Sequence, residues 1–322
     1  MQSLDFIAIG DTTVDEFIEL EDASVHCDIN NEECTISMRW GDKIPFKGST
    51  LVPGVGNAAN AAVSAARLGL RSGFVSNIGT DRFGDDIMAT FTREALDTSF
   101  ITRHKDVPTN HHYVLSFHSE RTILIKHEAY PYRFPGDLPE PKTIYFSSIA
   151  GGTESYHDAV AEYLEAHPNV FFAFQPGTFQ MKMGAKRLER LYRRADLFVV
   201  NKEEAERVLE VPETPLRELA EKLHALGPKI VIVTDGRNGV SALHEGTFFH
   251  LDMYPDIKPP VNRTGAGDAF SSTTAAYLTM GMPLKDAMIR GTINSAYVVQ
   301  KVGAQAGLLS KDALEAAVIG KK

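Results

Sequence analysis

The stretch VNRTGAGDAF at residues 261–270 places three small residues before an aspartate at the start of a predicted helix. The apolar run that follows, AFSSTTAAYLTM, has helical length. Gly265, Ala266 and Gly267 would therefore present free N–H groups at the positive end of the helix dipole. Such an end binds anions readily, most often phosphate. The pattern predicts a phosphate-binding helix start, beside which the negative charge of Asp268 needs a role of its own.

Three further polar stretches follow predicted strands. GDTTVD at 10–15 ends the first strand, NKEE at 201–204 follows LFVVN, and TDGRNG at 234–239 ends KIVIVTD. Carboxylate and amide oxygens are ligands that Mg²⁺ prefers, and a short carboxylate such as Asp15 can accept hydrogen bonds from two sugar hydroxyls. NKEE is equally typical of a capped helix, and the Asp-Gly and Asn-Gly pairs also favour plain turns.

These stretches must be positioned by regular elements. Apolar strands (FIAIG, GFVSNIG, TIYFSS, NVFFAFQ, LFVVN, KIVIVTD) alternate with predicted helices at 57–68, 83–96, 153–166, 184–195 and 215–226. This alternation indicates βαβ units and an α/β fold with a mostly parallel central sheet covered on both faces. Ligands in such folds bind at the carboxyl ends of the strands.

Two regions break this alternation. Residues 16–52 and 110–128 contain strand-like segments (EFIELED, CTISMRW, HHYVLSFH, RTILIKHE) with no helices between them. We expect them to form a small β-sheet lid that excludes water from the site. The α/β catalytic domain would then consist of residues 1–15, 53–109 and 129–322.

The bulk properties narrow the class of protein. The 322-residue chain is 43% hydrophobic and has a formal net charge of −9. Such a chain can bury a large core, and its acidity argues against a nucleic-acid or membrane-surface partner. No uncharged apolar run reaches about 18 residues, and the start MQSLDFIAIGD does not look like a signal peptide. We therefore expect a cytoplasmic protein.

The cysteines and two histidines carry weaker signals. Cys27 and Cys34 lie in HCDINNEEC without metal-ligand spacing. Free thiols are the favoured prediction, with a disulfide between neighbouring strands as the alternative. His111 and His112 could touch a substrate, although exposed polar positions on a strand are the favoured interpretation.

Two stretches of the sequence resemble the signatures of the ribokinase-like, or PfkB, carbohydrate kinases. NRTGAGD is similar to the C-terminal signature, and GNAANAAVSAARLG resembles the N-terminal one, with Asn60, Gly69 and Gly79 spaced as in that family. Val55 stands where a glycine is usual, Asn262 replaces an aspartate, and a small residue is more common at the position of Arg263. The resemblance covers most of the chain and implies a three-layer αβα ribokinase-like fold.

The resemblance also implies a reaction. It suggests an ATP-dependent, Mg²⁺-requiring kinase that phosphorylates a primary hydroxyl of a sugar or sugar-like substrate. Asp268 would be the general base, and the N–H groups of Gly265, Ala266 and Gly267 would form the anion hole. A nucleoside kinase on the same fold is the alternative, and a regulator that binds sugar or nucleotide without catalysis is a further one.

The resemblance assigns the other site residues by position. Those matched to the acceptor are Asp15, Gly56, Asn57 and Asn60. Those matched to ATP are Asn201, Glu204, Thr234, Gly236 and, near the adenine, Asn294. Glu204 would hold Mg²⁺ through water.

Two further properties of the family carry over as expectations. The loop QKVGAQAG at 300–307 and Asn262 match a site that binds a monovalent cation in the family. Activation by K⁺ is left open as an expectation, because Asn262 supplies no negative charge to such a site. Lid strands of two family subunits often pack together, and a small sheet needs a partner surface. We therefore expect a homodimer through the lids, which carry the apolar residues Phe17, Ile36, Trp40, Phe46, Tyr113, Leu115 and Phe117.

Overall fold

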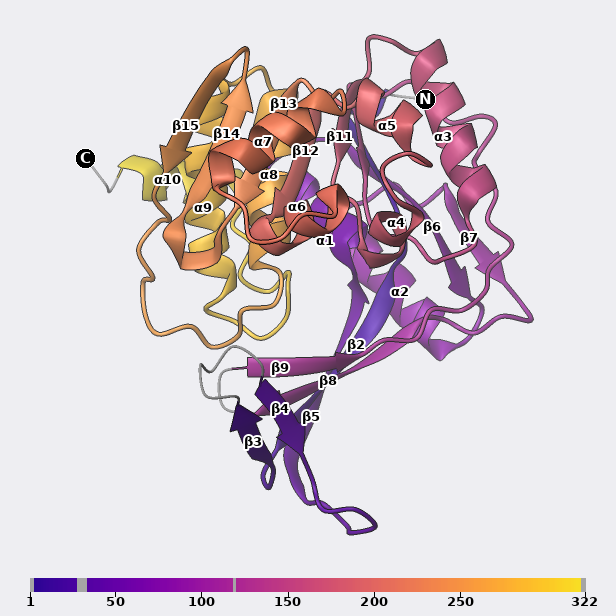
Figure 1. Cartoon of the computed structure of the whole chain (residues 1–322). Coiled ribbons are helices and arrows are strands. Elements are labelled where there is room, and N and C mark those ends of the chain that lie inside the picture. The colour runs from indigo at the N-terminus through magenta and orange to yellow at the C-terminus, as the bar shows by residue number, and fades with distance from the viewer. Residues whose placement is uncertain (1–2, 28–33, 118–119, 320–322) are drawn as a thin grey trace.

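The computed structural model describes residues 3–27, 34–117 and 120–319, which form one large sheet flanked by helices and two smaller sheets (Figure 1). In these residues the large sheet has nine strands, in the order β15 (Thr247–Leu251), β14 (Val240–His244), β13 (Ile230–Thr234), β12 (Leu197–Asn201), β11 (Phe171–Phe174), β10 (Thr143–Phe146), β1 (Phe6–Ile9), β6 (Ser72–Gly79) and β7 (Ile101–His104). All pairs from β13 to β7 are parallel, whereas β14 and β15 pair in antiparallel fashion. The mostly parallel sheet predicted from the sequence is confirmed.

Both faces of this sheet are buried, which explains why its strands are continuously apolar. In β1, Phe6 and Ala8 pack into one core cluster, and Ile7 and Ile9 pack into the other. The first cluster is covered by α1 (Asn57–Arg67), α2 (Arg82–Arg93), α8 (Ala266–Thr279), α9 (Leu284–Val298) and α10 (Lys311–Ile319). The second is covered by α3 (Glu154–Ala166), α4 (Thr178–Met183), α5 (Glu189–Arg194), α6 (Lys202–Leu209) and α7 (Leu216–Ala225). The result is the expected three-layer αβα arrangement.

One predicted helix is wrong in its bounds. The sequence predicts a single helix over 184–195, but α4 ends before Gly184 and α5 begins only at Glu189. Gly184 has φ 81°, a left-handed conformation that ends helices and favours glycine. Of the helices that the structure describes, none is long and apolar enough to cross a membrane.

A separate four-stranded sheet projects from one side of the α/β body (Figure 1). Its order is β5 (Phe46–Val55), β2 (Thr13–Leu20), β8 (His111–Phe117) and β9 (Glu120–Leu124). Strands β2 and β8 are parallel, and the outer pairs are antiparallel. We call this sheet the lid sheet. The exact division between lid and body stays a prediction, because β2 runs unbroken through the boundary expected at residue 15.

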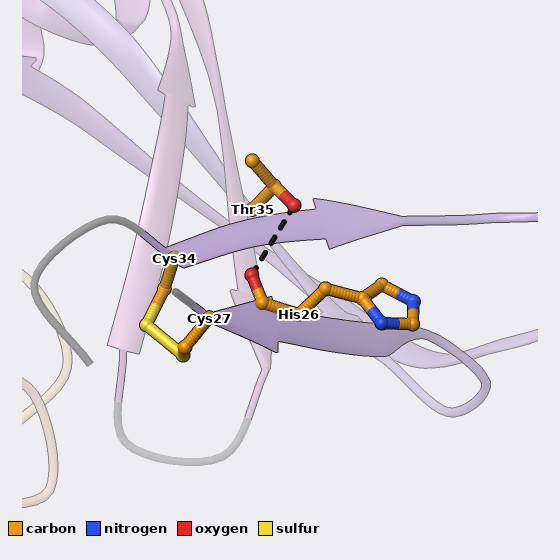
Figure 2. Close-up of a disulfide and its surroundings, with 4 residues drawn as sticks. All are labelled: His26, Cys27, Cys34 and Thr35. Atoms are coloured by element: carbon orange, nitrogen blue, oxygen red, sulfur yellow. Dashed lines mark hydrogen bonds between the residues drawn. A yellow bond between two sulfur atoms is a disulfide. The ribbon is translucent and has the colours of Figure 1, made fainter. Parts of the chain in front are cut away.

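The hairpin of β3 (Ser24–Cys27) and β4 (Cys34–Ser37) corrects the prediction of free thiols. Cys27 pairs directly with Cys34 in the antiparallel register, and the two form a disulfide with a Cα–Cα distance of 4.0 Å (Figure 2). The next pair along is tied by Thr35, whose hydroxyl donates to the carbonyl of His26 at 3.3 Å. Cross-strand neighbours lie close enough for a disulfide, so the alternative weighed from the sequence holds.

Candidate active site

The start of helix α8 lies in a cavity of about 260 Å³ at the carboxyl edge of the large sheet. Asn201 and Thr234 line the same cavity and are the last residues of β12 and β13. Parallel strands end together at this edge, which is where open α/β sheets bind their ligands. Three stretches predicted separately from the sequence therefore meet in one place.

The backbone at the helix start is shaped for close approach. Gly265 caps α8 with φ 84°, and a Cβ there would lie 2.4 Å from the Cβ of Ala304. A Cβ added to Gly267 would meet nothing within 4 Å, so this side of the helix opens into the cavity. Within the described chain, the N–H groups of Gly265 and Gly267 donate to no backbone carbonyl. Unpaired donors at a helix N-terminus can bind an anion.

Asp268 is half-buried in this cavity and held by three side-chain amides. Its Oδ1 accepts from Asn57 Nδ2 at 3.1 Å and from Gln175 Nε2 at 3.4 Å, and its Oδ2 accepts from Asn60 Nδ2 at 2.8 Å. The hydroxyl of Tyr145 donates to the Gln175 oxygen, which turns the Gln175 amide nitrogen toward the carboxylate. Among the described residues, the carboxylate is thus oriented by amides and forms no ion pair with a cationic side chain.

The surroundings raise the pKa of Asp268 above its ordinary value, because the site removes water from around the carboxyl. Hydrogen bonds from the three amides and the positive charge of Arg121 act in the opposite direction. A carboxylate with a raised pKa is a stronger base, and its fixed orientation suits proton transfer. The geometry is therefore that of an oriented carboxylate beside an open helix N-terminus.

Asn57 and Asn60, predicted to bind the acceptor, both contact Asp268 in the structure. Asn60 is buried, and its Oδ1 accepts from Gln305 Nε2 at 3.0 Å, so both ends of its amide are used. Gly56 precedes α1 with φ 117°, and a Cβ there would lie 2.8 Å from the carbonyl oxygen of Asp11. These contacts hold the first turn of α1 against the site.

Asn201 and Glu204 form a reciprocal cap at the start of α6. Asn201 Oδ1 accepts from the Glu204 N–H at 2.7 Å, and Glu204 Oε2 accepts from the Asn201 N–H at 2.9 Å. Both side chains also line the Asp268 cavity, so capping and a place in the site coexist. Burial is the main cause that raises the pKa of Glu204, and the charge of Asp268 adds to it.

A second cavity of about 140 Å³ adjoins the first and shares Thr234, Arg263, Ala266 and Gly267 with it. Gly236 also lines it and opens the short 3₁₀ helix η1 (Gly236–Asn238), which connects antiparallel strands β13 and β14. The remaining lining is largely apolar and aromatic: Arg237, Met253, Tyr254, Asp256, Phe270, Ser295, Ala296 and Val299. This composition suits a nucleotide base.

Asn294, matched to the adenine contact, is fully buried in the structure. Its Nδ2 donates to Thr273 Oγ1 at 2.8 Å, and its Oδ1 accepts from the Leu309 N–H at 2.9 Å. The amide is used inside the fold, so this geometry does not support a nucleotide contact for Asn294. Ser295, the next residue, lines the cavity instead.

Asn262 precedes the start of helix α8 in the sequence and is buried. Its Oδ1 accepts from the Thr264 N–H at 2.8 Å, and its backbone N–H donates to the Val299 carbonyl at 3.2 Å. The side-chain oxygen matched to a monovalent cation therefore orders its own loop. Ala304 of the 300–307 segment packs against Gly265, which brings the two parts of the matched cation site together.

The acceptor end of the site gathers carboxylates and histidines. Asp15 is buried, and its Oδ1 has no hydrogen-bond partner although His112 Nδ1 lies 3.4 Å away. The Nε2 of His112 is likewise buried without a partner, and only 12% of the side chain is exposed. His111 is 16% exposed and lies 3.4 Å from Glu16. The expectation of exposed histidines was therefore wrong, because both side chains, at the start of β8 in the lid sheet, are largely covered.

Asp11 has a structural role at the same end. It accepts from the Tyr132 hydroxyl at 2.8 Å and from the Ala150 N–H at 2.9 Å, and His127 Nδ1 lies 3.0 Å from it. These contacts order the loop after β1. Asp15, His111 and His112, at the same end, each have a buried polar atom without a hydrogen-bond partner.

Sequence reasoning missed Gln175, Arg121 and His127 as members of the site. Gln175 follows β11 directly, so its place after a buried strand was the available signal. Arg121 lies on β9, where nothing in the sequence marks the direction of its side chain. Which side chains of a lid strand reach the site depends on how the lid sheet packs against the α/β body.

Comparison with known proteins matches this geometry to a family. The model of the pfkB family carbohydrate kinases matches residues 42–311. The chain is 25% identical over 315 residues to a ribokinase of Staphylococcus aureus (strain COL), with 94% of this chain and 95% of the relative covered. It is 26% identical over 270 residues to a cytidine kinase of Thermococcus kodakarensis, with coverage of 78% and 89%.

Solved structures agree on the fold. A nucleoside kinase of Methanocaldococcus jannaschii superposes with a TM-score of 0.81 at 17% identity, and a ribokinase of Arabidopsis thaliana complexed with ribose and ATP does so with 0.81 at 19% identity. Each comparison covers 98% of both chains. This similarity establishes the ribokinase-like fold, and the family match extends over most of the sequence. The chain belongs to the pfkB family and is an ATP-dependent carbohydrate kinase.

Proposed function

We propose that this kinase transfers the γ-phosphate of ATP to a primary hydroxyl of a sugar or sugar-like acceptor. The observation that carries the proposal is the Asp268 carboxylate, which three amides orient beside the open N-terminus of α8. Asp268 is the general base, and the backbone of Gly265, Ala266 and Gly267 is the anion hole.

The proposed step balances in atoms and charge. The acceptor hydroxyl gives its proton to Asp268 as its oxygen bonds to the γ-phosphorus, and the bond to the β,γ-bridging oxygen breaks to release ADP. The N–H groups at the start of α8 neutralise charge on the phosphoryl oxygens. The amides of Asn57 and Asn60 keep Asp268 in position, which we propose as their part in the reaction.

The donor side follows from the adjoining cavities. We assign Thr234 and Gly236 to the ATP phosphates and the apolar cavity beside them to the base. Mg²⁺ would neutralise phosphate charge when bound. The described residues hold no group of three or more His, Cys, Asp and Glu side chains suited to a metal, so its ligands would come mainly from phosphates and water, with Glu204 and Asn201 as hard oxygen partners. A K⁺ ion near Asn262 would gain only neutral oxygens.

The acceptor side supports a hydroxyl-rich molecule. The buried oxygen of Asp15 and the Nε2 of His112 lack partners, and paired acceptors and donors of this kind suit sugar hydroxyls. A nucleoside is the alternative acceptor, because the similar proteins include a cytidine kinase. A nucleoside also offers a primary hydroxyl, on its ribose, so the chemistry at Asp268 would be the same.

An ADP-release screen tests the proposal. The acceptors are ribose, fructose, deoxy-ketogluconate, adenosine, cytidine, inosine and fructose phosphates. Asp268→Asn should lower turnover with the best acceptor by about 10²–10⁴-fold while nucleotide binding persists. Asp85→Asn, which removes an exposed carboxylate paired with Arg103, is the matched control and should leave turnover unchanged.

Two results would contradict the proposal. Near-normal turnover of the Asp268→Asn variant would leave Asp268 as a helix-start residue only. If the wild type binds ATP and an acceptor tightly without releasing ADP, the chain is a binding regulator instead.

A further inference from the structure

The side chain of Arg121 enters the Asp268 cavity from the lid sheet. Arg121 lies on β9 and lines this cavity together with the start of α8. Its Nε is buried and has no hydrogen-bond partner, and its guanidinium makes no ion pair within the residues that the structure describes. By contrast, Arg290, another partly buried arginine, pairs with Glu315 at 2.5 Å. Because buried charged donors are normally paired, an unpaired guanidinium in a cavity points to an anionic ligand.

Asp268 is not that partner. Its two oxygens already accept hydrogen bonds from Asn57, Asn60 and Gln175, and none from Arg121. The charge of Arg121 nevertheless acts on the Asp268 carboxyl and lowers its pKa. The guanidinium is therefore within electrostatic range of the reacting carboxylate while its donors stay available.

The acceptor is also a poor source of the anion. The acceptor end carries the carboxylates of Asp11 and Asp15, which repel a negatively charged substrate. Neither residue lines the cavity that contains Arg121. The anion nearest to both the helix start and Asp268 during the proposed reaction is the transferred phosphoryl group.

We propose that Arg121 binds the transferred phosphoryl group from the lid side, as a further catalytic residue. The inference rests on the proposed function. The N–H groups of α8 contact the phosphoryl from the body, and the Arg121 guanidinium donates hydrogen bonds to its non-bridging oxygens from the lid. Arg121 loses no proton in this step and offsets developing negative charge.

The lid sheet and its hairpin position this arginine. Arg121 also lines a second cavity of about 310 Å³, together with Leu115 and Thr122 of β8 and β9. The opposite wall is formed by Cys34 and Ile36 of the disulfide-linked hairpin. The arginine thus lies between the hairpin and the active site, and the phosphoryl site is complete only when the lid is in place.

Binding measurements test the contact without catalysis. Titration calorimetry compares ADP with the non-hydrolysable triphosphate β,γ-imido-ATP, each with Mg²⁺, in the wild type and in Arg121→Met. We expect the variant to bind β,γ-imido-ATP at least about 10-fold more weakly, as the loss of a charge-assisted hydrogen bond implies, with ADP affinity unchanged. Arg39→Met is the matched control, since Arg39 lies in the other inserted region, residues 16–52, and its side chain is 83% exposed.

Kinetics with the acceptor found in the screen give a second readout. Arg121→Met should lower kcat by about 10²–10³-fold, the typical cost of one preorganised donor at a developing charge, with little change in acceptor KM. Arg121→Lys should recover part of kcat, because it keeps the charge and loses the planar fork.

Three results would overturn the role of Arg121. These are equal losses of ADP and β,γ-imido-ATP affinity, affinities and kcat equal to the wild type, or an effect confined to acceptor KM. If the wild type phosphorylates no acceptor, the proposed function fails. The comparison of the two nucleotides still tests Arg121 in that case.

Discussion

The side chain of Asn60 donates a hydrogen bond from Nδ2 to Oδ2 of Asp268 at 2.8 Å, across 208 residues of sequence. Asn60 lies in the first turn of α1 and Asp268 in the first turn of α8, so the two motifs picked out in the sequence meet in space. Asn60 also accepts from Gln305, which ties the amide to a third segment. The contact links the assembly of the fold to the ionisation of the proposed base.

We predict that Asn60→Leu moves the acidic limb of the pH–rate profile to higher pH. The Asn60 hydrogen bond favours the charged carboxylate and so lowers the pKa of Asp268. Without it the pKa rises further, and because the base must be deprotonated to act, activity is lost at a higher pH. The measurement is kcat/KM from pH 5 to pH 9.

Asn77→Leu is the control for this change. Asn77 is similarly buried but pairs with His104 in a different part of the body. Its profile should keep the wild-type acidic limb. An unshifted limb in Asn60→Leu would mean that another group sets the pH dependence.

Local patterns were enough to predict the body of the fold and to single out Asp268 as the proposed base. The strands of the large sheet are buried on both faces and read as apolar runs, so their order along the chain indicated βαβ units. Asp268 stands in a glycine-rich helix start, which has a physical meaning on its own. Asn201 and Thr234 follow strands, where parallel sheets collect their ligands.

The remaining features depend on contacts between distant segments. The sequence could not show that Asn57 and Asn60 turn toward Asp268, because that direction is set by packing of α1 against α8. It could not show that the Asn294 amide is hydrogen-bonded to Thr273 and to the loop before α10. The prediction that Cys27 and Cys34 are free thiols failed, because the register of the hairpin places them opposite each other.

Glu204→Gln is predicted to raise the Mg²⁺ concentration needed for half-maximal rate. Glu204 Oε2 is used in the cap of α6, whereas Oε1 accepts no hydrogen bond from the described residues. The substitution removes the charge that would orient metal-bound water and keeps the shape of the side chain. Losses of about 10-fold or more in apparent metal affinity are typical when such an outer partner is changed.

The neighbouring Glu203 supplies the control. It is exposed in the same first turn of α6, so Glu203→Gln changes the net charge equally without altering the cavity. Mg²⁺ titrations of both variants at saturating ATP distinguish the two positions. Equal Mg²⁺ dependence in the two variants would leave Glu204 with its capping role alone.

Asp15→Asn is predicted to raise acceptor KM by about 10-fold or more, with little change in the KM for ATP. The Asp15 oxygen is buried and unpaired, and the substitution replaces a charged carboxylate, which forms the stronger hydrogen bonds, by a neutral amide. Glu16→Gln is the control, because Glu16 follows on the same strand and lies beside His111. Equal changes in both KM values for Asp15→Asn would show a general distortion and exclude a specific acceptor contact.

The last prediction concerns the surface of the lid sheet. We propose that two copies of the chain associate through it. Both edge strands expose apolar side chains, with Phe46 of β5 55% exposed and Leu124 of β9 52% exposed, and Trp40 nearby is fully exposed. Unpaired edges with apolar surface are unfavourable in water unless another surface covers them. Phe17, expected to contribute to this surface, is instead buried.

Sedimentation velocity at micromolar concentration should show a dimer of the 35.4 kDa chain. The double variant Phe46→Asp and Leu124→Asp should sediment as a monomer, because charges placed in an apolar contact are not solvated. Ile319→Asp is the control, since Ile319 is 69% exposed at the end of α10, outside the lid sheet. A wild type that is monomeric and fully active at this concentration would show that the lid sheet needs no second subunit, and that its apolar edges are stable in water as they stand.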